Sequence, residues 1–170
     1  LIFVLVGILL LQFVTNDNVT LRGYFTPSKN YDSDKVNKMV VLVHGGPQAR
    51  DSWLFDSDVH VLSQHGYSVL RVNFRGSVGY GTEFEHAGFK QWGGDIQQDI
   101  AEAVDWAVNN KRISAENICI AGHSFGGYSA VMSPINYPEK YRCAVASMGV
   151  YDLPLMYEEG DTIEVNSLII

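Results

Sequence analysis

Apolar and polar positions follow two different periods along this chain, one typical of strands and one of helices. Residues 39–43 and 118–121 are continuous apolar runs, as expected for strands covered on both faces. Residues 68–74 and 143–148 have a similar apolar character and predict two further strands. Strict alternation over residues 19–26 predicts a strand that is buried on one face only.

Helical periodicity occupies stretches between these strands. Residues 95–110 give the clearest helix, because their apolar side chains recur at steps of three and four. Residues 51–65 predict a second helix, and a third follows residue 127 up to about residue 137. Residues 75–92 are rich in glycine and predict a loop. Strands and helices alternating at this spacing predict an α/β protein with a mostly parallel, doubly wound sheet.

The first 14 residues are almost wholly apolar, and their role is open. A membrane-spanning helix needs about 20 residues, and a signal peptide begins with positive charge, which is missing here. The segment is therefore a signal-peptide core, a buried element or the end of a longer membrane segment. Residues 15–170 then form one partial domain. Membrane association and compartment stay undetermined.

Net charge excludes one class of partner. The 170 residues carry a formal net charge of −7. Nucleic-acid binding requires a concentrated basic face, whereas Arg71, Arg75 and Arg112 are scattered along the chain. We therefore expect no nucleic-acid partner.

The two cysteines, Cys119 and Cys143, each lie inside an apolar run. We expect two buried free thiols that pack as small hydrophobic side chains. Their spacing matches neither a metal site nor a disulfide framework.

Residues 122–127, GHSFGG, carry the most specific chemical signal. A G-x-S-x-G motif between a strand and a helix is typical of the nucleophile elbow of an α/β-hydrolase. Glycine is required on both sides because the turn is too tight for neighbouring side chains. The motif predicts Ser124 as the nucleophile and the backbone amide of Phe125 as one donor to an oxyanion.

Residues 44–47, HGGP, follow the predicted strand at 39–43. Ligands of open α/β sheets bind at this edge of the sheet, so the glycine pair could present amides to the same oxyanion. A tight turn without chemical function is the alternative. His44 precedes the glycines, and we expect it to bond neighbouring backbone and orient the loop rather than act as a base.

Residues 73–81, NFRGSVGYG, end the next strand on the same edge. Arg75 and Tyr80 are candidates for lining a substrate cleft, and Arg75 could equally tie loop carbonyls together. All five histidines precede Ser124, whereas the general base of an α/β-hydrolase follows its serine. Asp152 is a weak candidate for the triad acid. His60, His65 and His86 are expected on the surface, and His123 is expected to point away from the elbow.

These motifs together resemble the catalytic domain of the prolyl oligopeptidase family of serine peptidases, in particular its acylaminoacyl-peptidase and dipeptidyl-peptidase branch. The matching strings are HGGP at 44–47, NFRGSVGYG at 73–81, WGGDIQQD at 92–99, GHSFGGY at 122–128 and GVYDLPLMYEEGD at 149–161. The resemblance covers roughly residues 19–161, most of the chain.

The resemblance implies an α/β-hydrolase fold, truncated here at its C-terminal end. It implies cleavage of short peptides by Ser124, an oxyanion hole formed by the amides of Gly46 and Phe125, and no metal or cofactor. In the family, the triad acid and histidine lie beyond the equivalent of residue 170, and a β-propeller usually precedes the hydrolase domain. A carboxylesterase and a non-catalytic binding domain of the same fold are the alternatives.

Overall fold

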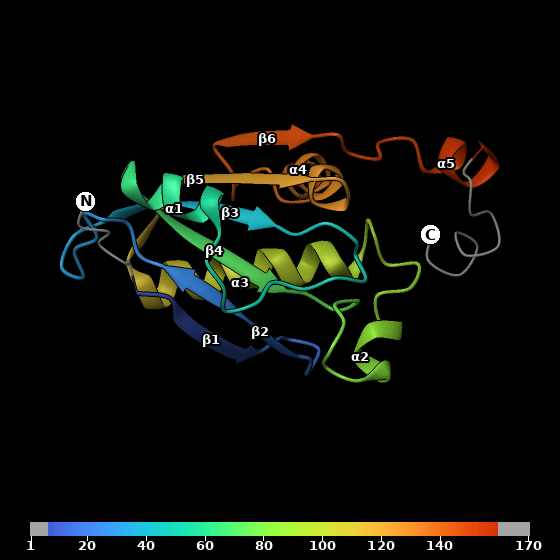
Figure 1. The fold of residues 1–170 in the computed structure, drawn as a ribbon, viewed down its shortest axis with the longest axis horizontal. Helices are drawn as coiled ribbons and strands as arrows, with labels where there is room; N and C mark the ends of the chain where they lie inside the picture. The colour runs from blue at the N-terminus through green and yellow to red at the C-terminus, as the bar shows by residue number, and fades with distance from the viewer. Residues whose placement is uncertain (1–6, 160–170) are drawn as a thin grey trace.

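A computed structural model describes residues 7–159, which form a six-stranded sheet and the helices around it (Figure 1). The strands are β1 (Leu9–Val14), β2 (Thr20–Thr26), β3 (Asn37–Val43), β4 (Tyr67–Asn73), β5 (Ile113–His123) and β6 (Cys143–Ser147). The helices are α1 (Ser57–Gln64), α2 (Thr82–His86), α3 (Asp95–Lys111), α4 (Phe125–Asn136) and α5 (Leu153–Glu159).

The sheet has the strand order β1-β2-β4-β3-β5-β6. Strands β4, β3, β5 and β6 are parallel, and β1 and β2 add an antiparallel pair beside β4. The predicted mostly parallel, doubly wound sheet is therefore confirmed. Because parallel strands all end at one edge, the segments that follow β3, β4 and β5 meet there.

The core lies between the sheet and helices α3 and α4, which pack against each other and against β5. The apolar stripe predicted on α3 is buried, including Ile96, Ile100 and Val104. Each such aliphatic side chain contributes about 1.5–3 kcal/mol when it is removed from water. The aromatic rings of Phe74 and Phe125 are also fully buried, with centroids 5.5 Å apart.

Residues Leu9–Val14, whose role was open, form edge strand β1 and pair with β2 from Leu9↔Phe25 to Val14↔Thr20. Leu11 points into the core, whereas Leu10 is 63% exposed. No helix within residues 7–159 is long and apolar enough to cross a membrane. The rest of the apolar segment, residues 1–6, lies outside the described residues.

Several predicted boundaries shift. Helix α1 begins at Ser57 rather than at residue 51, because the Asp56 side chain accepts hydrogen bonds from the amides of Asp58 and Val59. The glycine-rich segment 75–92 contains the short helix α2. Strand β5 begins at Ile113, earlier than the apolar run alone indicated.

The prediction of two free thiols is wrong, because Cys119 and Cys143 form a disulfide between β5 and β6. The two residues are direct partners in the parallel register, with Cα atoms 4.7 Å apart. Their separation of 24 residues in the sequence gave no sign of this pairing, which the sheet creates. Cys143 also lies on a strand whose side chains are exposed rather than buried.

Candidate active site

Ser124 occupies the single position between β5 and α4, with φ 57° and ψ −122°. A side chain at positive φ costs about 1–3 kcal/mol and persists only where the surroundings enforce it. The Ser124 amide donates to the Ser147 carbonyl of β6 at 3.0 Å, and the Ser124 carbonyl accepts from the Tyr128 amide at 3.1 Å. Its hydroxyl makes no capping bond to α4. The backbone therefore fixes the residue and leaves Oγ available.

Three glycines make this turn possible by close backbone approach. A Cβ on Gly122 would collide with the backbone of Gly126, and a Cβ on Gly126 would collide with the carbonyl of Val43 in β3. A Cβ on Gly127 would lie 2.7 Å from the carbonyl oxygen of Ser147 in β6. Glycine is required at these positions because α4 lies too close to β3, β5 and β6 for a side chain to fit. Backbone flexibility is the lesser reason.

Two backbone amides near Ser124 in the sequence or in the neighbouring loop, those of Phe125 and Gly46, donate no hydrogen bond within residues 7–159. The amide of Phe125 is the first of α4, so it has no acceptor within the helix, and the positive end of the helix dipole reinforces it. The loop after β3 runs alongside, since a Cβ built on Gly45 would lie 3.6 Å from the Cβ of Ser124. Gly46 has φ 120°, and its amide donates to no acceptor within residues 7–159.

His44 is held in this loop rather than directed at the serine. Its Nδ1 lies 2.8 Å from the Gly45 carbonyl oxygen and its Nε2 lies 3.1 Å from Ser77 Oγ. The imidazole stacks on Phe74 with centroids 4.3 Å apart. Burial lowers the pKa of His44 to about 4, although its bond to Gly45 opposes this. The predicted backbone bond is confirmed, and the ring is neutral at pH 7.

A hollow of about 410 Å³ opens at this edge of the sheet and is lined by His44, Gly45, Gly122 and His123. The sequence analysis missed three carboxylates on its wall, namely Asp51, Asp56 and Asp58. The available signal was three aspartates within residues 51–58, shortly after HGGP. Burial raises the pKa of Asp51 to about 6, and Arg71, whose Nη1 is 3.3 Å away, opposes that shift.

Arg75 does not line this hollow but is buried among carboxylates. Its guanidinium bonds both oxygens of Asp99 at 2.9 and 2.7 Å, Asp95 at 3.0 Å and Asp17 at 2.8 Å. Its amide also donates to Asp99. Burial raises the pKa of Asp99, and the bonds from Arg75 oppose that shift. Arg75 thus ties together carboxylates of two segments, α3 and the turn between β1 and β2, whereas a cleft-lining role and bonds to loop carbonyls had been the two alternatives.

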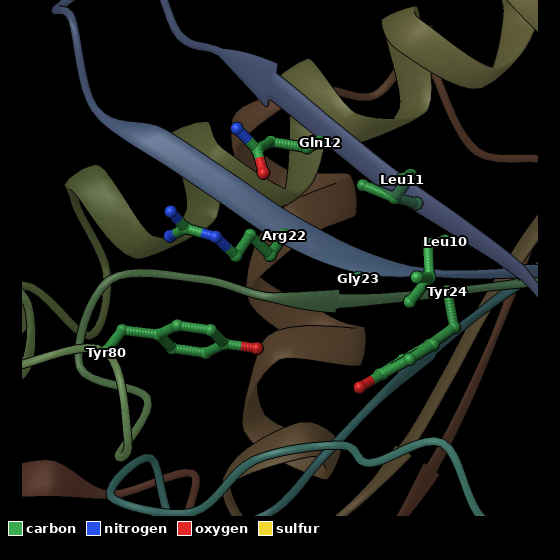
Figure 2. Close-up of a pocket in the computed structure, with 7 residues that line it drawn as sticks. All are labelled: Leu10, Leu11, Gln12, Arg22, Gly23, Tyr24 and Tyr80. Atoms are coloured by element: carbon green, nitrogen blue, oxygen red, sulfur yellow. The ribbon is translucent and has the colours of Figure 1, made fainter.

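Tyr80 lines a different hollow, of about 240 Å³, beside β1 and β2 (Figure 2). Its hydroxyl accepts a hydrogen bond from Asn73 Nδ2 at 2.7 Å. The residue therefore belongs to the same edge of the sheet as the elbow, on the side of β2 and β4.

No histidine partner reaches Ser124 within residues 7–159, a range that contains all five histidines. His65 bonds the carbonyl of Val61, and His123 is exposed and lines the hollow of about 410 Å³. Asp152 accepts from the Leu155 amide at the start of α5, a capping contact rather than a bond to a histidine. Within the same range, no group of histidine, cysteine and acidic residues could hold a metal ion.

A serine on a strained strand-to-helix turn, with free amides beside it at the carboxyl edge of a parallel sheet, defines the α/β-hydrolase fold. Residues 53–166 match the model of the prolyl oligopeptidase family, and this chain belongs to that family.

Relatives and solved structures agree with this assignment. The chain is 36% identical to dipeptidyl aminopeptidase BIII of Pseudoxanthomonas mexicana over 84% of its own length and 22% of the relative's. It is 40% identical to dipeptidyl peptidase family member 6 of Caenorhabditis elegans over 68% of its length and 16% of the relative's. The acylaminoacyl peptidase of Pyrococcus horikoshii superposes with a TM-score of 0.87 at 22% identity, over 96% of this chain and 27% of that one.

The chain thus spans about a fifth of the length of the curated relatives that it matches. The family and the fold of this segment are established by these matches.

Proposed function

We propose that this chain supplies the nucleophile and the oxyanion hole of a serine peptidase that cleaves short peptides through an acyl-enzyme on Ser124. The observation that carries the proposal is the backbone of Ser124, held at φ 57° between β5 and α4, with a hydroxyl that makes no hydrogen bond within residues 7–159. Relatives named dipeptidyl peptidases support peptides as the substrate class.

In this mechanism, Ser124 Oγ attacks the carbonyl carbon of a peptide bond while a general base removes its proton. The carbonyl oxygen becomes negatively charged, and the amides of Phe125 and Gly46 donate hydrogen bonds to it. Losing one such donor typically reduces kcat by about 10²–10³. Collapse of the intermediate releases the amine product, and water then hydrolyses the acyl-enzyme.

The base is not one of the residues that the structure describes around Ser124. The family resemblance implies a triad acid and histidine later in the chain, and a β-propeller before the hydrolase domain. The proposal therefore concerns the protein at its natural length, in which His44 orients the Gly45-Gly46 loop and stays neutral.

A fluorophosphonate probe on the natural-length protein tests the nucleophile directly. We expect covalent labelling at Ser124, loss of labelling in Ser124→Ala, and a loss of peptide turnover of about 10⁴-fold or more in the same variant. Ser129→Ala, in the next turn of α4, is the matched control for the loss of a hydroxyl. Labelling that survives in Ser124→Ala contradicts the proposal, and turnover of aryl esters without any peptide turnover favours the carboxylesterase alternative.

A further inference from the structure

Four arginines gather around β2, β4 and their loops, and they divide into two pairs. Arg71 and Arg75 are buried and contact carboxylates, Arg71 with Asp51 and Arg75 with Asp99. Arg22 and Arg50 have no ion pair with any residue of 7–159. The first pair has its counter-charge inside the fold, and the second pair does not.

Both unpaired guanidinium groups lie over one aromatic ring. The Cζ atoms of Arg22 and Arg50 are 5.3 Å and 5.9 Å from the centroid of Tyr80. Cation–π attraction holds each group to the ring, but it leaves their positive charges uncompensated. Two cations brought to one ring repel each other, so an anion that approaches both is attracted more strongly than by either alone.

The ring itself is fixed by a network of hydrogen bonds. Asn73 Nδ2 donates to the Tyr80 hydroxyl at 2.7 Å and to the Asp51 carbonyl at 3.2 Å, and Asn73 Oδ1 accepts from the Asp51 amide at 2.8 Å. Because the Tyr80 oxygen accepts this bond, its own hydrogen remains available to a ligand. The position of the ring is therefore set before any ligand binds, which reduces the entropic cost of binding.

A hollow of about 240 Å³ lies beside this group, lined by Gln12, Arg22, Tyr24 and Tyr80 among others. Figure 2 shows the hydroxyl groups of Tyr24 and Tyr80 pointing toward one another, with Arg22 facing Tyr80 from β2. The walls combine the guanidinium of Arg22, the hydroxyl of Tyr80 and the apolar side chain of Leu10, and the guanidinium of Arg50 lies over the same Tyr80 ring. This chemistry suits the carboxylate of a peptide better than a neutral ligand.

The same loops connect this group to the elbow. Arg50 follows Gly46 by four residues, so their Cα atoms are at most about 14 Å apart. The two loops are joined by the bond from the Val78 amide to the Ala49 carbonyl and by the contact of His44 with Ser77. A substrate carboxylate bound over Tyr80 therefore belongs to a residue only a few positions along the substrate from the peptide bond that Ser124 attacks.

We propose that Arg22, Arg50 and Tyr80 form a carboxylate-binding subsite that selects peptide substrates carrying a negative charge near the cleaved bond. The charge comes from the C-terminus of a short peptide or from an Asp or Glu side chain. This inference rests on the proposed peptidase function and adds a substrate preference to it.

The test compares matched short peptides with the natural-length protein. Each peptide is prepared with a C-terminal carboxylate and with a C-terminal amide, and a second series exchanges Glu for Gln at each position. We expect kcat/KM to be about tenfold higher for the charged form in one of the two series. The series that shows this difference identifies the source of the charge. The ratio falls toward one in Arg22→Met and Arg50→Met, and Arg50→Lys retains part of it because the charge remains.

Arg142→Met is the matched control. Arg142 precedes β6, next to the opposite edge of the sheet, is exposed and has no ion pair within residues 7–159. We expect this variant to keep the ratio of the unaltered protein. A ratio of one in both series for the unaltered protein, or a ratio that survives in both methionine variants, overturns the subsite.

Binding to Ser124→Ala separates failure of the subsite from failure of the function. The Kd of the charged peptides for this variant is expected to be about tenfold lower than that of the neutral forms. Equal Kd values overturn the subsite even where turnover is normal. No turnover of any peptide by the unaltered protein, together with no labelling of Ser124, overturns the proposed peptidase function.

Discussion

The two sides of the nucleophile elbow differ sharply in how they are packed. On one side, β3 is buried, with Val41 fully inaccessible and Val43 nearly so. On the other side every side chain of β6 is exposed, and Val145 is 61% and Met148 75% accessible. Figure 1 shows β6 at the edge of the sheet, with α5 beyond its end.

Ser124 nevertheless depends on both sides. Gly126 allows α4 to approach the Val43 carbonyl of β3, and the Ser147 carbonyl of β6 accepts the Ser124 amide. The geometry of the elbow is therefore a property of the backbone, whereas the buried side chains that stabilise it lie on β3, β4, β5 and the helices, and none of those within residues 7–159 lies on β6. Substitutions on the two sides should therefore differ in cost.

The largest effect is expected from Arg75→Met on the buried side. The substitution leaves Asp99, which has no accessible side-chain surface, as a buried charge without its partner. We expect a loss of about 4 kcal/mol in the free energy of opening. Amide hydrogen exchange of α3 measures it, with Arg142→Met as the exposed control. A loss below about 1 kcal/mol would show that the buried carboxylate of Asp99 does not depend on this cation.

Next in size is removal of the disulfide that attaches β6 to β5. The bridge closes a segment of 24 residues, and the double substitution Cys119→Ala and Cys143→Ala should cost about 3 kcal/mol by the chain-entropy argument. The loss should be concentrated in the exchange of β6 amides, because other contacts hold β3 and β5. Two reactive thiols in the unfolded, unreduced protein would contradict the bridge itself.

A valine-to-alanine pair compares the two sides directly. Val41→Ala opens a cavity in a fully buried position and should cost about 2–3 kcal/mol. Val145→Ala, chemically the same change on β6, should cost less than about 0.5 kcal/mol. Urea unfolding of the natural-length protein measures both. Equal costs would mean that β6 is covered in the natural-length protein.

The smallest effect concerns the protonation of His44 on the buried side. Its pKa of about 4 lies below the value of about 6.5 for an unfolded histidine. The unfolded state therefore binds a proton first as the pH falls. The contribution of the neutral His44 ring to the free energy of unfolding is fully present above about pH 6.5 and is lost as the pH falls toward 4.

Histidine NMR titration of the folded protein checks this value. A His44 pKa above 6 would mean that the ring is solvated and would weaken its assigned role in orienting the loop.

Much of the site could be predicted from the sequence because its motifs are local. The GHSFGG string specifies a strand, a tight turn and a helix within a dozen residues, and HGGP specifies the loop beside it. The α3 stripe is equally local, since helical periodicity determines which face is buried. These features require no knowledge of distant contacts.

The remaining features could not be predicted because they depend on pairing between distant segments. Cys119 and Cys143 meet only through the register of β5 and β6. Arg75 was a cleft candidate by position, yet Asp17 and Asp99 approach it from remote parts of the chain. The carboxylates Asp51, Asp56 and Asp58 line the hollow beside the elbow because the segment between β3 and α1 and the start of α1 return to the ends of β3 and β5.

The sequence by itself determined the strand-to-helix turn at Ser124, the candidate nucleophile at its apex and the family, since each depends on residues adjacent in the chain. Only the tertiary structure decided which charges are paired. Arg71 and Arg75 find carboxylates inside the fold, whereas Arg22 and Arg50 meet only at Tyr80. The physical reason is that charge pairing depends on distances across the sheet, which no local pattern encodes.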